Sequence, residues 1–240
     1  MDLKTMLAGG KYNRGHCPIC ACPTVFVELG EWLRDQYLCV LCHSVPRWRA
    51  VIEVLDSYFP NWRDLTVHES SPGGASSEKL ARECPGYLGT HFFKDVQMGR
   101  CRDGIRCEDL ESQTFEDERF DLVITQDVFE HLFEPERAFR EIHRTLKPGG
   151  AHVFTVPWYY WQPTRVRAVR ENGGVRHLDT PDYHVNPIDP DGSLVTREWG
   201  YDLADIIYRS CAMTTTVVRI RDRAKGIDGA MCEVFVSRKS

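Results

Sequence analysis

Two closely spaced pairs of cysteines near the start of this 240-residue chain restrict its fold more than any other feature. Cys17 and Cys20 form the first CxxC pair, and Cys39 and Cys42 form the second, with the eighteen residues 21–38 between them. Two such turns supply four thiolates, which is the ligand set of a closed tetrahedral zinc site. We therefore predict that these four cysteines hold a structural Zn²⁺ ion.

The spacing of the pairs is typical of a zinc ribbon, which we place at residues 1–45, with a second domain at 46–240. Strands are predicted at 24–29 and 36–38, leading into the second pair. Cys22, His16 and His43 lie close enough in sequence to compete as ligands. Two disulfides or a redox pair are the alternatives, but a reducing compartment disfavours structural disulfides.

Beyond the cysteine pairs, short apolar runs alternate with segments of helical periodicity. This alternation predicts an α/β domain whose mostly parallel sheet is covered on both faces. Residues 158–200 show little regular pattern, and we expect a long loop region there. The predicted helices are 47–59, 76–84, 135–146 and 201–209, and the predicted strands are 65–68, 87–90, 120–125, 151–156, 214–220 and 231–237.

Charge and hydropathy exclude several classes of protein. The formal net charge of −5 disfavours nucleic acid as a partner, because binding a phosphate backbone requires positive charge. No apolar run approaches the ~18–20 residues that span a bilayer. Residues 1–16 lack the apolar core of an export signal. We expect a cytoplasmic protein without a membrane segment.

Residues 120–150 carry the pattern FDLV, then EH, then A.REI.R.LKPGG. This pattern resembles that of the class I S-adenosylmethionine-dependent methyltransferases, and within them the type 11 group. The resemblance implies a Rossmann-like, seven-stranded sheet whose last strand enters antiparallel as part of a hairpin. It also implies S-adenosyl-L-methionine as the cofactor.

The resemblance places a cofactor loop after the strand at 65–68. Glu69 matches the acidic position of the family's loop, and Gly73 matches its second glycine. Ser71 stands where the first glycine is expected, and Ala75 stands in place of the third. We expect Glu69, Ser71 and Gly73 to bind the cofactor, because a glycine-containing loop beyond a parallel strand lets the backbone approach a ligand.

Four further residues are expected at the cofactor. His91 follows the second strand, where the family usually has an acidic residue for the ribose, and a neutral imidazole can bond a hydroxyl. Asp109 and the backbone of Leu110 match the segment that meets the adenine, although Asp109 also belongs to an acidic run that solvent alone would explain. Gln126, at the end of the strand 120–125, completes the set.

Methyl transfer from a sulfonium is an in-line displacement that mainly requires alignment, and a base only for an acceptor that holds its proton tightly. His131, His184 and Tyr183 are the predicted catalytic residues, with a purely structural histidine as the alternative for His131. The predicted acceptor is a small molecule or a sugar or glycan precursor, methylated on O, N or C. We expect the ribbon to pack near the cofactor, and a homodimer is a candidate assembly.

Two other functions compete with this interpretation. Some ribosomal-RNA methyltransferases also join a zinc ribbon to such a domain. The net charge and the lack of an Asn/Asp-Pro-Pro-aromatic motif disfavour that function here. The third candidate is a degenerate cofactor-binding regulatory protein, favoured by the altered positions Ser71, Ala75 and His91. Binding of the cofactor would separate the third from the first two.

Overall fold

The computed structural model describes residues 11–186 and 188–240. At its N-terminal end, three antiparallel strands form a small sheet in the order β1-β2-β3. The strand β1 was not predicted, and residues 1–10 of the predicted ribbon lie outside the described residues. The elements are β1 (Tyr12–Cys17), β2 (Cys22–Glu28), the four-residue helix α2 (Leu33–Gln36) and β3 (Tyr37–Cys39).

The second sheet has eight strands in the order β17-β18-β9-β8-β4-β5-β7-β6. Strands β7, β5, β4, β8 and β9 run parallel, β18 is antiparallel to β9, and β17 is antiparallel to β18. The predicted seven-stranded sheet with its terminal hairpin is thus confirmed, and the two-residue β6 adds an eighth strand at one edge. The strands are β4 (Val67–Ser70), β5 (Tyr87–His91), β6 (Cys101–Arg102), β7 (Ile105–Cys107), β8 (Phe120–Gln126), β9 (Leu146–Thr155), β17 (Thr214–Val218) and β18 (Val234–Arg238).

Helices cover both faces of this sheet, which explains why its central strands are almost continuously apolar. On one face α3 and α4 pack against a core that includes Leu122 and Ile124 of β8. On the other face α5 and α6 pack against a core that includes Val123, because successive side chains of a strand point to opposite faces. The helices are α3 (Pro46–Tyr58), α4 (Gly74–Glu83), α5 (Pro135–Thr145) and α6 (Leu203–Cys211), with 3-10 turns η1 (Trp62–Asp64), η2 (Phe129–His131) and η3 (Arg223–Lys225).

The segment 158–200 differs from the prediction of a long loop. It folds into short strands, and two pairs of them form hairpins, β12–β13 and β14–β15. These strands are two to six residues long and largely polar, so they carry no hydrophobic periodicity that a sequence could reveal. They are β10 (Trp158–Tyr159), β11 (Arg165–Val166), β12 (Ala168–Glu171), β13 (Gly174–His177), β14 (Tyr183–Asn186), β15 (Asp189–Leu194) and β16 (Arg197–Gly200).

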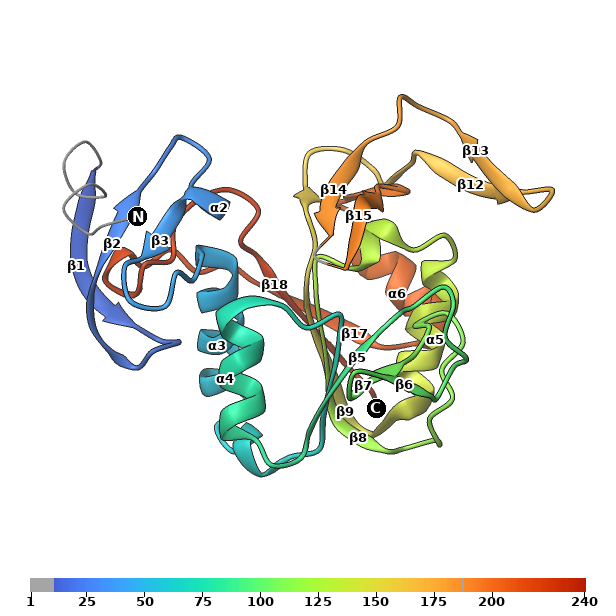
Figure 1. Cartoon of the computed structure of the whole chain (residues 1–240), viewed down its shortest axis with the longest axis horizontal. Helices are drawn as coiled ribbons and strands as arrows, with labels where there is room; N and C mark the ends of the chain where they lie inside the picture. Colours follow the sequence, from blue (N-terminus) through green and yellow to red (C-terminus); the bar gives the residue numbers. More distant parts are fainter. Residues whose placement is uncertain (1–10, 187) are drawn as a thin grey trace.

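The small N-terminal sheet is joined to the large one by a shared core and by the segment between β17 and β18, which runs back to it (Figure 1). Phe26 and Tyr37 belong to the same cluster of buried residues as α3 and the central strands. The fully buried Arg49 of α3 donates to the carbonyls of Tyr37 and Gly226, at 2.7 and 2.6 Å. No described helix is long and apolar enough to cross a membrane.

Candidate functional site

The two CxxC turns bring four sulfur atoms together at one end of the small sheet. The Sγ atoms of Cys17 and Cys42 are 3.7 Å apart, those of Cys20 and Cys39 are 3.9 Å apart, and all four lie within 4.8 Å of one another. Four sulfurs bound tetrahedrally to zinc at ~2.3 Å lie about 3.8 Å from each other. The four cysteines therefore fit a structural zinc ion, whose presence remains a proposal.

Three further residues lie beside the four cysteines and contact their sulfur atoms. All ten cysteines are free, and separations of this size exclude disulfides, whose sulfurs lie ~2.05 Å apart. Cys22 lies beside the cluster, with its Sγ 3.5 Å from that of Cys20, but outside the group of four. The hydroxyls of Thr24 and Ser44 lie 3.3 and 3.2 Å from the sulfurs of Cys39 and Cys42. Polar contacts of this kind orient metal ligands.

The carboxyl ends of β4, β5 and β8 form the edge at which the cofactor was predicted. Glu69, at the end of β4, is 1% exposed. Its carboxylate accepts hydrogen bonds from Ser77, Tyr87 and Gln126, at 2.7–2.8 Å. Burial raises the pKa of Glu69, although these three hydrogen bonds oppose the effect. These hydrogen bonds hold Glu69 against Gln126 and against the start of α4. Contact of Glu69 and Gln126 with a cofactor stays a prediction.

Two residues of the loop after β4 have left-handed backbone conformations. Ser71 and Gly74 adopt positive φ angles of 56° and 74°. A Cβ on Gly74 would lie 2.2 Å from the Trp48 ring, so this position requires glycine. Gly73 is extended, and a Cβ placed on it would meet nothing within 4 Å. Open space therefore lies beside Gly73, where the predicted cofactor would approach the backbone.

The residues predicted to contact the ribose and the adenine of the cofactor lie along the same edge. His91 ends β5, and its Nδ1 is buried without a hydrogen-bond partner among the described residues. Burial lowers the pKa of His91 against an opposing contact with the Pro72 backbone, and a neutral imidazole is able to bond a ribose hydroxyl. Asp109 is half-buried and accepts from the Glu111 amide at 2.8 Å, whereas the side chain of Leu110 is buried in the core. This edge thus fits S-adenosylmethionine, with His91 offering an orphaned polar atom.

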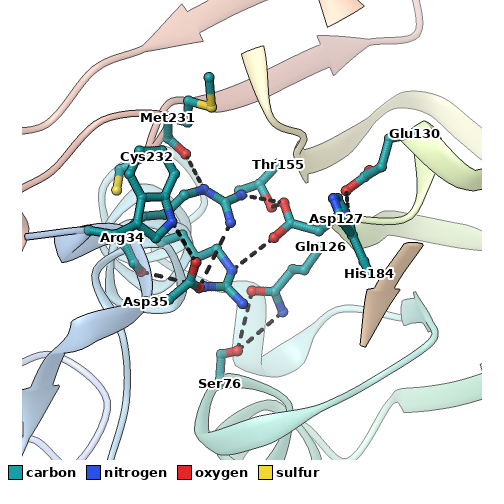
Figure 2. Close-up of polar contacts among 12 residues, drawn as sticks. Arg34, Asp35, Ser76, Gln126, Asp127, Glu130, Thr155, His184, Met231 and Cys232 are labelled. Carbon is teal, nitrogen blue, oxygen red and sulfur yellow. Dashed lines mark hydrogen bonds and ion pairs between the residues drawn. The ribbon is translucent and has the colours of Figure 1, made fainter. Parts of the chain in front are cut away.

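Asp127, directly after β8, makes contacts that the sequence did not reveal. Arg34 of α2 and Arg47 of α3 approach its carboxylate at 2.7 and 2.8 Å, and Thr155 donates to it at 3.0 Å (Figure 2). Only 18% of the Asp127 side chain is exposed, against 7% for Arg34. Burial alone would raise the pKa of Asp127, but the two guanidiniums hold it at about 2. A buried ion pair between Arg34 and Asp127 therefore joins residues 11–45, here called the N-terminal module, to the end of the central strand β8.

This lowered pKa has a consequence for acid stability. A carboxylate whose pKa is depressed on folding stabilises the protein above its ordinary pKa of 3.8, and this contribution is lost as the pH falls toward about 2. We expect the difference in unfolding free energy between the wild type and Asp127→Asn to be largest above pH 5 and to shrink toward pH 2. Urea unfolding at several pH values measures it. A difference that stays constant over this range would contradict the assignment.

Two of the three predicted catalytic residues, His131 and His184, meet beyond β8. His131 lies in η2 and His184 in β14, and their ring centroids are 5.0 Å apart at an interplanar angle of 89°. Burial is the main reason that both have lowered pKa values, with that of His131 at about 4. Tyr183 is 54% exposed, and its side chain points to the face of β14 opposite that of His184. The structure brings the two histidines together and leaves Tyr183 outside.

Two surface hollows lie near this edge, beside residues that neighbour the predicted cofactor residues. One of about 460 Å³ lies between residues 111–115 and α5, and another of about 380 Å³ lies between the N-terminal module and α4. None of the predicted cofactor residues lines either hollow. The cofactor assignment therefore depends on the strand ends, the open space at Gly73 and the free Nδ1 of His91.

Part of the chain is similar in sequence to known proteins. Residues 72–154 match the profile of a family described as a methyltransferase domain. A ubiquinone biosynthesis O-methyltransferase from Coxiella burnetii is 23% identical over 152 residues, which cover 48% of this chain and 65% of that protein. A polyketide synthase-nonribosomal peptide synthetase from Aspergillus clavatus is 26% identical over 136 residues, 49% of this chain and 3% of that protein. The chain thus spans just under two thirds of the first relative's length.

The similarity to solved structures extends beyond residues 72–154. An S-adenosylmethionine-dependent methyltransferase from Mesorhizobium loti has a TM-score of 0.51 at 18% identity, covering 79% of this chain and 98% of its own. The Burkholderia thailandensis 1,6-didemethyltoxoflavin-N1-methyltransferase, with bound 1,6-didemethyltoxoflavin and S-adenosylhomocysteine, has a TM-score of 0.51 at 18% identity, covering 81% of this chain and 78% of its own. At such identities the likeness establishes the fold alone, which is the one predicted from the sequence.

Proposed function

The chain carries a methyltransferase domain with the Rossmann-like class I fold, and from this premise we propose that it transfers a methyl group from S-adenosyl-L-methionine to a small-molecule acceptor. The observation that carries the proposal is the conformation of the loop at the end of β4. Its backbone turns at Ser71 and Gly74 and leaves open space beside Gly73. The neighbouring Nδ1 of His91 lacks a partner.

In this proposal the cofactor lies across the ends of β4, β5 and β7. His91 bonds the ribose, Asp109 and the Leu110 backbone meet the adenine, and Glu69 and Gln126 hold the loop in shape. The cofactor supplies an activated methyl group, so the protein mainly aligns the acceptor and excludes water. A zinc ion held by the ribbon would have no open coordination position, because the four cysteines would fill all four.

The acceptor side lies at His131 and His184, where the β14–β15 hairpin covers the end of β8. A small molecule is the acceptor class we favour. The similar proteins include one named for ubiquinone biosynthesis and one solved with bound 1,6-didemethyltoxoflavin. The net charge of −5 disfavours an RNA acceptor. A sugar or glycan precursor methylated on O, N or C belongs to this class.

Gly73→Ala tests the cofactor site with little effect on the fold. The added methyl group enters the space in which the cofactor would lie, and Gly73 has an extended backbone that alanine adopts without strain. We expect the affinity for S-adenosylhomocysteine, measured by calorimetry, to fall about 10-fold or more. The free energy of unfolding should change by less than about 1 kcal/mol, the usual size of an N-cap effect.

Gly174→Ala is the matched control. Gly174 lies on the exposed strand β13, and a Cβ there would meet only the Glu171 carbonyl, at 3.8 Å. Its affinity for S-adenosylhomocysteine should equal that of the wild type. Wild-type protein that binds neither S-adenosylmethionine nor S-adenosylhomocysteine would overturn the proposed function and favour a degenerate regulatory protein instead.

A further inference from the structure

Glu130, His131 and His184 form a cluster, here called the Glu-His-His cluster, that the cofactor site does not use. Glu130 and His131 lie in η2, immediately beyond β8, and the β14–β15 hairpin brings His184 to them. One ligand atom from each of the three side chains lies within 4.8 Å of the other two. Residues far apart in the chain thus offer one carboxylate oxygen and two imidazole nitrogens to the same point.

Glu130 is the unusual member of the cluster. It is 1% exposed, and neither of its carboxylate oxygens has a hydrogen-bond partner among the described residues. The two imidazoles approach it without reaching hydrogen-bond distance, with Nδ1 of His184 at 3.7 Å and Nε2 of His131 at 3.8 Å (Figure 2 shows the first contact). A buried carboxylate without partners is costly, so this arrangement calls for a ligand that the carboxylate can bind.

The imidazole of His131 is oriented as a ligand. Its Nδ1 lies 2.9 Å from the carbonyl oxygen of Leu194. A carbonyl only accepts, so Nδ1 carries the proton and donates, and the lone pair of Nε2 faces Glu130. A histidine that binds a metal usually donates its other ring nitrogen in this way, which fixes both the tautomer and the ring orientation.

We propose that the Glu-His-His cluster binds a divalent transition-metal cation through a Glu130 oxygen, His131 Nε2 and His184 Nδ1. Two imidazoles and one carboxylate suit Zn²⁺ and neighbouring first-row ions, and three protein ligands leave coordination positions open. The His184 side chain is 41% exposed, so these positions face solvent. The cation would take an oxygen ligand there.

The surrounding charges accommodate a cation at this point. The nearby guanidiniums of Arg34 and Arg47 are already paired with Asp127, and Arg47 also pairs with Asp35. No guanidinium pairs directly with Glu130 among the described residues, although its burial and the neighbouring Asp127 raise its pKa. This site goes beyond the proposed methyl transfer, because binding of the cation requires neither the cofactor nor an acceptor.

Titration of Co²⁺ into zinc-loaded full-length protein tests the site. Zinc saturates the four cysteines beforehand, and a thiolate-to-cobalt charge-transfer band would reveal any exchange there. We expect one equivalent of Co²⁺ to bind without that band, with the visible absorption of nitrogen and oxygen ligation. His184→Ala and Glu130→Gln should each weaken binding by more than the ~10–100-fold typical of outer contacts to a metal ligand.

His177→Ala is the matched control, because His177 is an exposed histidine on the neighbouring strand β13. It should bind Co²⁺ like the wild type. His184 lies on a surface hairpin, so its variant should fold even if Glu130→Gln does not. Wild-type protein that takes up no Co²⁺ outside the cysteines, or His184→Ala that binds as tightly as the wild type, would overturn the proposal. The titration contains no S-adenosylmethionine, so its outcome is independent of the proposed function.

Discussion

Cys39→Ser is expected to abolish stoichiometric zinc binding and to unfold residues 11–45. Cys39 is fully buried, and its sulfur belongs to the four-cysteine cluster. Structural zinc contributes ~10–16 kcal/mol of apparent binding free energy in zinc-finger peptides, which matches or exceeds the whole stability of a typical domain, ~5–15 kcal/mol. Elemental analysis measures the zinc, and thermal unfolding followed by circular dichroism measures the stability.

The loss should extend beyond the ribbon. Cys17, Phe26 and Tyr37 share one buried cluster with α3 and the large sheet, so unfolding of the ribbon exposes that core to water. We therefore expect the melting temperature of the entire chain to fall in Cys39→Ser, and also in the wild type treated with a chelator.

Cys22→Ser is the control for this experiment. Its sulfur lies 3.5 Å from that of Cys20 but outside the group of four, so its replacement should leave both zinc content and melting temperature unchanged. Equal loss of zinc in Cys22→Ser and Cys39→Ser would assign Cys22 to the ligand set. Zinc-free wild type that melts at the same temperature as the zinc-loaded protein would refute a structural metal.

Asp127→Asn is expected to lower the free energy of unfolding by about 3–5 kcal/mol, the usual cost of leaving a buried charge without its partner. The substitution keeps the size of the side chain, and asparagine tolerates the positive φ of 53° at this position. It leaves Arg34, 7% exposed, without a full counter-charge. Urea unfolding at pH 7 measures the loss.

Asp35→Asn provides the matched comparison. Asp35 pairs with the same arginine, Arg47, but its side chain is 41% exposed. Exposed ion pairs contribute ~0–1 kcal/mol, so the expected loss is correspondingly small. A double-mutant cycle with Arg34→Gln and Asp127→Asn isolates the pair itself. Equal effects of the two aspartate substitutions, or strict additivity in the cycle, would contradict a buried ion pair between the modules.

Local patterns predicted much of this fold. The CxxC turns place two sulfurs each within a few residues, so their spacing alone predicted the four converging cysteines. The apolar run of β8, with its FDLV pattern, predicted a central strand, because only a strand buried on both faces is continuously apolar. The resemblance to the methyltransferase family singled out Glu69, Gly73 and His91, and the rule that parallel strands end together then places them at one edge.

Other features depend on contacts between distant segments. The strands of 158–200 are short and polar, and they form because each pairs with a neighbour rather than because of their own periodicity. The sequence also did not show that Tyr183 and His184 point to opposite faces of β14, because a strand was not predicted there.

The sequence by itself determined the α/β fold, the four-cysteine cluster and the strand ends at which the cofactor is predicted, because local spacing, hydrophobic periodicity and the family resemblance mark them. Only the tertiary structure decided that Arg34 reaches Asp127 and that His184 meets Glu130. Such pairs join charges from distant elements, and no local pattern marks them, because their energies depend on burial and on distances that exist only after the chain has folded.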